Sequence, residues 1–128
     1  MIQVRALANS DVSRAEQVCG AATARHPLSV ELHYLHAVLL LELGQVEAAA
    51  SAARRVIYLD RSLALAHFTL GSILRGLGDS EGARRAYRNA RDLCEARPAD
   101  ELVPLSDGER AGRLKEAADL QLTLLSGS

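Results

Sequence analysis

Apolar residues recur along most of the chain at the spacing of one helix face. Between residues 12 and 25 they follow the i, i+3, i+4 pattern of an amphipathic α-helix, and Pro27 ends that segment. Asn9-Ser10-Asp11 predicts a turn and a helix start, because these side chains accept hydrogen bonds from free backbone N–H groups. Whether residues 1–9 form a helix of their own is left open by the pattern. The same spacing predicts further helices at 29–43, 46–59, 63–77, 80–97 and 107–125.

The stretch from Val30 to Arg97 contains two copies of one sequence pattern, 34 residues apart. Gly44 recurs as Gly78 and His33 as His67, and further matched pairs share the same frame without a gap. A period of 34 residues is that of the tetratricopeptide repeat (TPR), a helix-turn-helix unit whose copies stack side by side. The repetition therefore predicts an all-α TPR superhelix of about three helix pairs, the first truncated, with a capping helix at the C-terminus.

A single TPR domain is predicted over residues 1–128. Its parts are a partial first repeat at 1–29, a second repeat at 30–63, a third at 64–97, a loop at 98–106 and a closing helix at 107–125. The closing helix carries one apolar face, made of Leu114, Ala118, Leu122 and Leu125. Such a face either caps the end of the repeat stack or competes for a binding groove, and the sequence leaves both alternatives open.

Composition and charge narrow the classes of function. Hydrophobic residues make up 48% of the chain and aromatic residues only 3%, which suits closely packed helices better than a β-sandwich. A net charge of -1 provides no field that would attract nucleic acid or an anionic membrane. No apolar run is long enough to span a bilayer and no signal-like segment follows Met1, so we expect a cytoplasmic protein without membrane insertion. Cys19 and Cys94, which lack CxxC spacing, are expected to be buried reduced thiols.

The first helix of each repeat supplies the candidate binding surface. In TPR proteins these helices line a concave groove, and the family frame assigns to it Tyr34, Val38, Leu41 and Glu42 from one repeat and Leu65, Phe68, Ser72 and Arg75 from the next. This groove is apolar, and it lacks the Lys and Asn with which some TPRs clamp a terminal carboxylate. An apolar groove suits an amphipathic helix of a partner protein. The alternative, that neighbouring helices cover these residues and that they bind nothing, stays open.

Arginines gather on the second helix of each repeat. The candidates for a basic docking patch are Arg54, Arg84, Arg88 and Arg91. Such a cluster is either a solvated outer face or a docking surface for an acidic partner. Nucleic acid is not expected, because no aromatic residues for base stacking accompany the arginines.

The residue spacing indicates neither a catalytic nor a metal site. The glycines between Gly71 and Gly82 fit no phosphate-binding motif, and no Ser-His-Asp or Cys-His arrangement can be defended from spacing. His33 and His36 lie three residues apart on one helix, but no further ligands align with them to complete a structural metal site. We therefore expect histidines that serve in packing, no bound metal and no catalytic residues.

Several short sequence motifs are more specific than the general TPR pattern. They are Ile57-Tyr58-Leu59-Asp60, Leu63-Ala64-Leu65-Ala66-His67-Phe68, Arg85-Ala86-Tyr87-Arg88-Asn89-Ala90, Ser106-Asp107-Gly108 and Ala111-Gly112-Arg113-Leu114. Together they resemble the TPR extension at the C-terminus of some CheR-type chemoreceptor methyltransferases, in particular the FrzF-like branch that serves a gliding-motility pathway. Arg61 and His36 depart from the proline and leucine that are usual in that family.

The resemblance implies a role in signal transduction by bacterial chemotaxis proteins. It implies a non-catalytic regulatory module of a protein-glutamate methyltransferase, controlling substrate access or choice. S-adenosylmethionine would belong to a catalytic domain upstream of this chain, and no cofactor is expected in the chain itself. The partner would be the cytoplasmic region of a chemoreceptor or the enzyme's own catalytic domain. The alternative is a generic TPR scaffold, an assembly factor or a secretion accessory protein unrelated to methylation.

Overall fold

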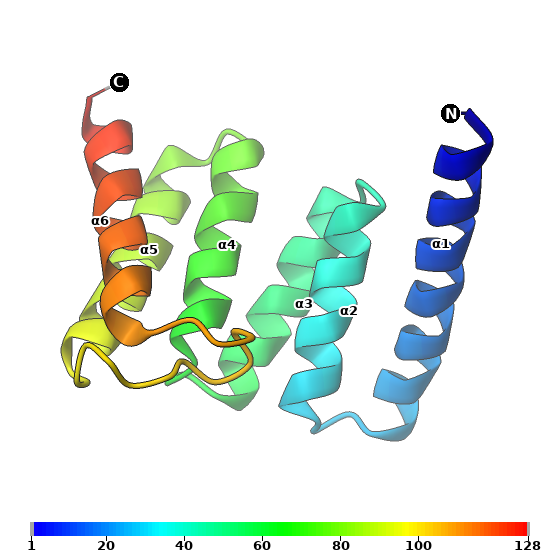
Figure 1. The fold of residues 1–128 in the computed structure, drawn as a ribbon, viewed down its shortest axis with the longest axis horizontal. Helices are drawn as coiled ribbons and strands as arrows, with labels where there is room; N and C mark the ends of the chain where they lie inside the picture. The colour runs from blue at the N-terminus through cyan, green and yellow to red at the C-terminus, as the bar shows by residue number, and fades with distance from the viewer. Residues whose placement is uncertain (1, 128) are drawn as a thin grey trace. The chain divides into compact units, whose positions relative to one another are not determined.

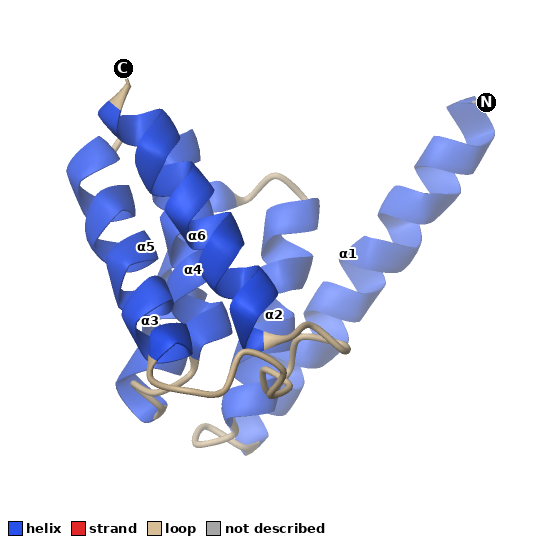
Figure 2. Cartoon of the chain, turned by 60° about the vertical axis from the view of Figure 1, so that its left-hand side comes forward, coloured by secondary structure: helices blue, strands red, loops and turns tan. Residues whose placement is uncertain are grey.

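The computed structural model describes residues 2–127 of the chain, with side chains described from residue 11 onward. The helices are α1 (Ile2–Arg25), α2 (Val30–Glu42), α3 (Val46–Leu59), α4 (Ala64–Gly76), α5 (Ser80–Glu95) and α6 (Ala111–Ser126). Within residues 2–127 there is no strand, and a single β-bridge joins Leu102 to Arg110 (Figure 2). The predicted all-α class is confirmed.

The helices form two compact units. The first ends at Leu59 and contains α1 to α3, and the second begins at Asp60 and contains α4 to α6. In the first unit α2 packs against both α1 and α3, and in the second unit α5 packs against both α4 and α6 (Figure 1). Each unit is therefore three helices in which one, α2 or α5, packs against both of the others.

Both turns inside the repeats depend on a glycine with a left-handed backbone. Gly44 has φ 78° and Gly78 has φ 85°, a conformation that side chains other than glycine rarely adopt. In each turn the residue after the glycine donates its backbone N–H across the helix end, from Gln45 to Leu40 O and from Asp79 to Leu74 O, both at 2.9 Å. These bonds satisfy carbonyl groups that the end of a helix leaves without partners. The repeated glycine is thus explained by the geometry of the turn.

The repeated histidines fasten the loop that precedes each first helix. The Nε2 atom of His33 lies 2.8 Å from Pro27 O, and that of His67 lies 3.0 Å from Arg61 O. Because a carbonyl oxygen can only accept, Nε2 carries the proton in both rings. The two bonds occupy equivalent positions of the 34-residue frame, so His33 and His67 have a structural role in packing.

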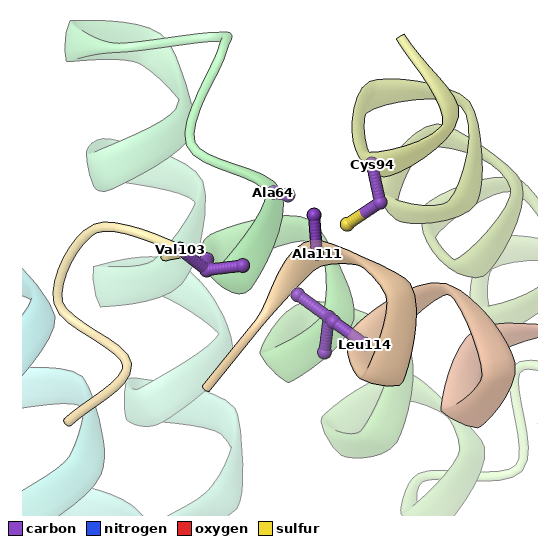
Figure 3. Packing of buried hydrophobic residues seen from close by; sticks show 5 residues of the cluster. All are labelled: Ala64, Cys94, Val103, Ala111 and Leu114. Carbon is purple, nitrogen blue, oxygen red and sulfur yellow. The ribbon is translucent and has the colours of Figure 1, made fainter. Parts of the chain in front are cut away.

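The second unit has its own hydrophobic core at the start of α4. Five buried side chains form it: Ala64, Cys94, Val103, Ala111 and Leu114 (Figure 3). They come from α4, α5, α6 and the loop between α5 and α6, and Leu65, Phe68 and Leu93 pack against them. The loop that the sequence predicts is thus folded into the core through Val103.

Two predicted helix starts are wrong. α1 runs unbroken through Asn9-Ser10-Asp11, where a turn was expected, because capping residues favour a helix start but do not prevent a helix when they face water, as Asp11 does. α6 begins at Ala111 and not at Asp107, because Asp107 and Gly108 have positive φ and form a turn. Ser106 Oγ accepts from Glu109 N at 3.0 Å inside this turn instead of capping a helix. The sequence left open whether residues 1–9 form a helix of their own. In the structure residues 2–9 are the first part of α1, and Met1 lies outside the described residues.

Candidate functional site

The second unit contains an open groove between α4 and α6, the α4–α6 groove, with a volume of about 550 Å³. Its lining residues are Leu65 and Phe68 of α4, Ser106 and Glu109 of the connecting loop, and Arg113, Leu114, Glu116, Ala117 and Leu120 of α6. The volume lies in the range of about 300–1,000 Å³ that is usual for ligand pockets. The floor is apolar, and the charged side chains stand at its edge.

The floor of the groove is held in place by the core beneath it. Phe68 packs edge-on against the buried ring of Tyr87, with ring centroids 5.3 Å apart and planes at 67°. Leu114 is buried in the core cluster, and Phe68 packs against the same cluster. Leu120, by contrast, is 58% exposed on α6. A fixed apolar floor beside an exposed leucine is the arrangement that accommodates an apolar side chain of a partner.

The edge of the groove carries charges of both signs. Arg113 lies 3.6 Å from Glu109 one turn away, in a pair whose arginine is largely exposed. Such exposed pairs contribute about 0–1 kcal/mol, so the pair leaves both groups available to a ligand. The charged lining consists of two carboxylates, Glu109 and Glu116, and one guanidinium, Arg113, so the groove accommodates a segment with an apolar centre and polar ends.

The connecting loop forms a rigid lip at one end of the groove. Val103 N donates to Glu109 O at 2.8 Å, and Ser106 Oγ donates to Val103 O. The guanidinium of Arg110 donates to Asp100 O across the same loop. These bonds hold Ser106 and Glu109 at the lip without help from a ligand.

The predicted groove residues of α4 are divided between two roles. Leu65 and Phe68 line the α4–α6 groove, and their place in a concave groove shared with α2 remains a prediction. Ser72 shares a hydrogen bond of 2.9 Å with the hydroxyl of Tyr87, and the guanidinium of Arg75 donates to Gln121 Oε1 of α6. These last two side chains connect helices and do not line this groove.

The predicted groove residues of α2 belong to the first unit. Tyr34 and Val38 are partly buried there, and Leu41 and Glu42 are exposed. None of them lines the α4–α6 groove. A single groove that includes residues of both α2 and α4 remains a prediction.

Two of the four candidate patch arginines are engaged inside the second unit. Arg84 pairs with Glu81 at 2.6 Å and also donates to Leu125 O at 3.3 Å, so it fastens the end of α6 to α5. Arg91 pairs with its neighbour Asp92 at 3.1 Å. Arg88 is exposed on α5 and Arg54 is exposed on α3. Their use as a docking patch remains a prediction.

The α6 side of the groove was missed by sequence reasoning. The loop between α5 and α6 shifts α6 out of the 34-residue frame, so no alignment with α2 or α4 could assign its residues. A signal was present, because Leu120 and Leu124 lie off the buried face of α6 and both are exposed. Leucines on a second face of an amphipathic helix are a reason to look for a binding surface.

Two further observations concern the part of the chain that the structure describes. No three or more His, Cys, Asp or Glu side chains gather there in a way that could hold a metal ion. None of the described helices combines the length and the apolar character needed to cross a membrane.

Comparison with protein families identifies the repeats. Two family models match, both described as tetratricopeptide repeat, the first over residues 4–64 and the second over residues 64–96. The chain is a tetratricopeptide-repeat protein. The TPR models cover α1 to α5 and end before the loop that leads to α6. No curated protein gives a significant sequence match.

Solved structures share the fold at low sequence identity. PcrH in complex with the chaperone-binding region of PopD aligns with a TM-score of 0.79 at 17% identity, covering 98% of this chain and 86% of PcrH. The Yersinia enterocolitica type III secretion translocator chaperone SycD aligns at 0.78 and 13%, covering 98% and 79%. The Sgt2 TPR domain from Aspergillus fumigatus aligns at 0.67 and 22%, covering 97% and 76%. At these identities the likeness shows a shared TPR fold.

Proposed function

We propose that this TPR protein is a non-catalytic binding module that holds an apolar segment of a partner protein in the α4–α6 groove. The observation that carries the proposal is the groove itself, in which the apolar floor around Phe68 lies beside the exposed Leu120. An assembly or chaperone role of the kind shown by PcrH, which is bound to a region of PopD, fits this groove better than a catalytic role does.

The size and lining of the groove set the strength of the contact. Burying an aliphatic or aromatic anchor contributes about 1.5–3 kcal/mol before the cost of ordering the segment is subtracted. Two or three such anchors contribute at most about 9 kcal/mol, so the dissociation constant is expected to be no tighter than about micromolar. Binding at that strength is reversible, as a chaperone or an assembly factor requires.

The test uses two leucines of the same helix. Peptides of about 16 residues are selected from a random display library on the full chain, then synthesised and titrated by fluorescence anisotropy. Leu120→Ser should weaken binding of the selected peptides about tenfold, because it removes an apolar wall of the groove. Leu124→Ser is the matched control, since Leu124 is equally exposed on α6 but does not line the groove.

Selected peptides should carry apolar residues at positions i, i+3 or i+4, and i+7, or at alternate positions if they bind in extended form. Peptides that bind the Leu120→Ser variant as tightly as the wild-type chain would place the site elsewhere. A library that yields no binding peptide would count against the proposed function.

A second candidate is the regulatory module of a CheR-type chemoreceptor methyltransferase. One observation favours it: the phrases that carry that resemblance, Ser106-Asp107-Gly108 and Ala111-Gly112-Arg113-Leu114, contribute three of the residues that line the α4–α6 groove. Neither the matching family models nor the similar structures describe a methyltransferase, so this candidate rests on the sequence resemblance.

The two candidates differ in the partner that the groove accepts. Glutamate-rich helical peptides from the methylation region of a chemoreceptor should bind the wild-type chain and not the Leu120→Ser variant if the second candidate holds. Binding of only non-acidic apolar peptides would support the broader function and reject the narrower one. A catalytic domain encoded in the same gene would support the narrower one independently.

A further inference from the structure

The first unit contains a second apolar groove, which lies between α1 and α2 and has a volume of about 490 Å³. Its apolar lining consists of Ala15, Val18 and Ala22 of α1 and Leu32, Leu35 and Leu39 of α2. Val18 is 61% exposed and Leu35 is 48% exposed. Asp11 and Arg14 lie at one end and are the charged side chains that line it. This α1–α2 groove is separate from the α4–α6 groove, which belongs to the other unit.

The repeat frame shows what normally covers this face of α1. Ala15, Val18 and Ala22 recur 68 residues later, after two repeats, as Ala83, Ala86 and Ala90 of α5. The three residues of α5 are all buried. Their helix packs against α4, which is the first helix of the same repeat. The corresponding face of α1 is open, so the place that a first helix would occupy is exposed.

Two contacts in the second unit give the position of that first helix. In α4, Gly71 lies against Tyr87, and Leu74 Cδ1 lies 3.0 Å from the position of a Cβ at Gly82. Tyr87 and Gly82 of α5 correspond in the frame to Cys19 and Arg14 of α1. Both Cys19 and Arg14 line the α1–α2 groove. A helix placed on α1 as α4 is placed on α5 therefore fills this groove.

Residues 2–10 do not supply this helix. α1 is continuous from Ile2, so residues 2–10 extend the second helix of the first repeat and do not fold back as its first helix. We propose that the α1–α2 groove binds an amphipathic helix of a partner protein, which takes the place of the first helix of the first repeat. The proposed site lies within the first unit, and the proposal does not depend on the function proposed for the α4–α6 groove.

The frame also defines the chemistry of the partner helix. The partner residue that packs against Cys19 corresponds to Gly71, which packs against Tyr87 in the second unit. This partner residue is small, but it need not be glycine, because the side chain of Cys19 is smaller than that of Tyr87. Three positions later the partner residue lies above Arg14, where an acidic side chain makes an ion pair that a leucine cannot make. The partner helix thus has a small residue followed three positions later by Asp or Glu, on an otherwise aliphatic face.

The test uses a peptide copied from this chain. The probe has the sequence of residues 63–77 with Gly71→Ala and Leu74→Glu, carries lysines at its ends for solubility, and is titrated into the full chain by fluorescence anisotropy. Val18→Glu should weaken binding of the probe at least about tenfold, because it places an unpaired charge in an apolar contact. Tyr58→Glu is the matched control, since Tyr58 is 79% exposed on α3 outside the groove and should leave the affinity unchanged.

A charge exchange tests the position of the helix. Arg14→Glu should weaken the probe, and a second probe with lysine in place of the introduced glutamate should bind this variant more tightly than it binds the wild-type chain. Failure of the charge exchange, or equal binding of the probe by the Val18→Glu and wild-type chains, overturns the proposal. Circular dichroism of each variant separates loss of binding from loss of folding, and Leu120→Ser should leave binding of this probe unchanged.

Light scattering distinguishes a partner helix from a second copy of the chain. A wild-type chain that is monomeric at about micromolar concentration keeps the groove free for a partner. A dimer that the Val18→Glu substitution dissociates would show that a second copy occupies the groove, and this result would overturn the proposal.

Discussion

The ring of Tyr87 occupies the space that a side chain at position 71 would need. A Cβ atom at Gly71 would lie 2.9 Å from two ring carbons of Tyr87, whose side chain is fully buried. The hydroxyl of the same ring is hydrogen-bonded to Ser72, which fixes its orientation. α4 and α5 can therefore pack at this distance only with glycine at position 71.

This contact makes Gly71→Ala destabilising. We expect the free energy of unfolding to fall by up to about 2 kcal/mol, because overpacking against a fixed ring costs about 1–3 kcal/mol and the gain in helix propensity returns only about 1 kcal/mol. Gly76→Ala on the same helix is the control, since a Cβ there meets nothing within 4 Å, and it should be neutral or stabilising. Urea denaturation measures both variants. Equal stabilities would show that the Tyr87 ring moves without cost.

Substitution of the glycines in the two repeat turns should also destabilise the fold, but for a different reason from substitution of Gly71. At Gly44 and Gly78 an added Cβ meets nothing within 4 Å, but both residues have positive φ. Substitution by alanine should therefore cost about 1–2 kcal/mol through backbone conformation alone. Asparagine tolerates this conformation better, so Gly78→Asn should cost less than Gly78→Ala in thermal unfolding. If asparagine is no better than alanine, the cost does not come from the backbone.

The closing helix α6 should be required for folding of the second unit. Its residues Leu114, Ala118 and Leu125 are buried, which favours a cap over a competitor for the groove. Leu114→Ala should cost about 2–5 kcal/mol, the range for truncating a buried leucine. Leu124→Ala on the exposed face should change stability by less than about 0.5 kcal/mol.

Removal of residues 107–128 gives a second measurement of the same role. We expect loss of the helical signal of α4 and α5 in circular dichroism, because the core cluster loses Ala111 and Leu114. A truncated chain that stays folded would show instead that α6 is not needed as a cap, which is the result expected if α6 competes for the surface of α4.

The thiol of Cys94 should make stability depend on pH in the alkaline range. Burial raises the pKa of this thiol above its ordinary value of 9.0, and the nearby Arg97 lowers it by less. The folded state therefore holds the proton more tightly than the unfolded state does. The stability that the protonated Cys94 thiol contributes is fully present at pH values below the ordinary pKa, which applies to the unfolded state. It is lost as the pH rises through the raised pKa of the folded state. Between about pH 8 and about pH 10 the wild-type chain should lose more stability than Cys94→Ala, measured by urea denaturation.

The fold could be predicted from the sequence because the repeat encodes it twice. The glycines at 44 and 78 and the histidines at 33 and 67 each meet one geometric requirement in two places, so their recurrence identifies the helix pairs. The start of α6 could not be predicted, because the left-handed backbone at Asp107 depends on bonds between Val103 and Glu109 that no local pattern reveals.

The α4–α6 groove as a whole could not be predicted from the sequence, for a related reason. Leu65 and Phe68 follow from the repeat frame, but the opposite wall of the groove comes from α6, which the loop displaces from that frame. Ser72 and Arg75 have the right register for a groove and were expected there. In the structure the Ser72 hydroxyl is hydrogen-bonded to Tyr87 and the Arg75 guanidinium to Gln121, contacts with α5 and α6 that the repeat frame does not reveal.

The equivalent hydrogen bonds of His33 and His67 allow one type of bond to be compared in two environments within a single chain. One molecule contains the same donor, the same tautomer and the same loop carbonyl in two settings, one partly exposed and the other buried. Replacing each histidine by phenylalanine, singly and together, would compare the two bonds within a single sequence. The difference between the two single variants reports how burial changes the contribution of this hydrogen bond to stability.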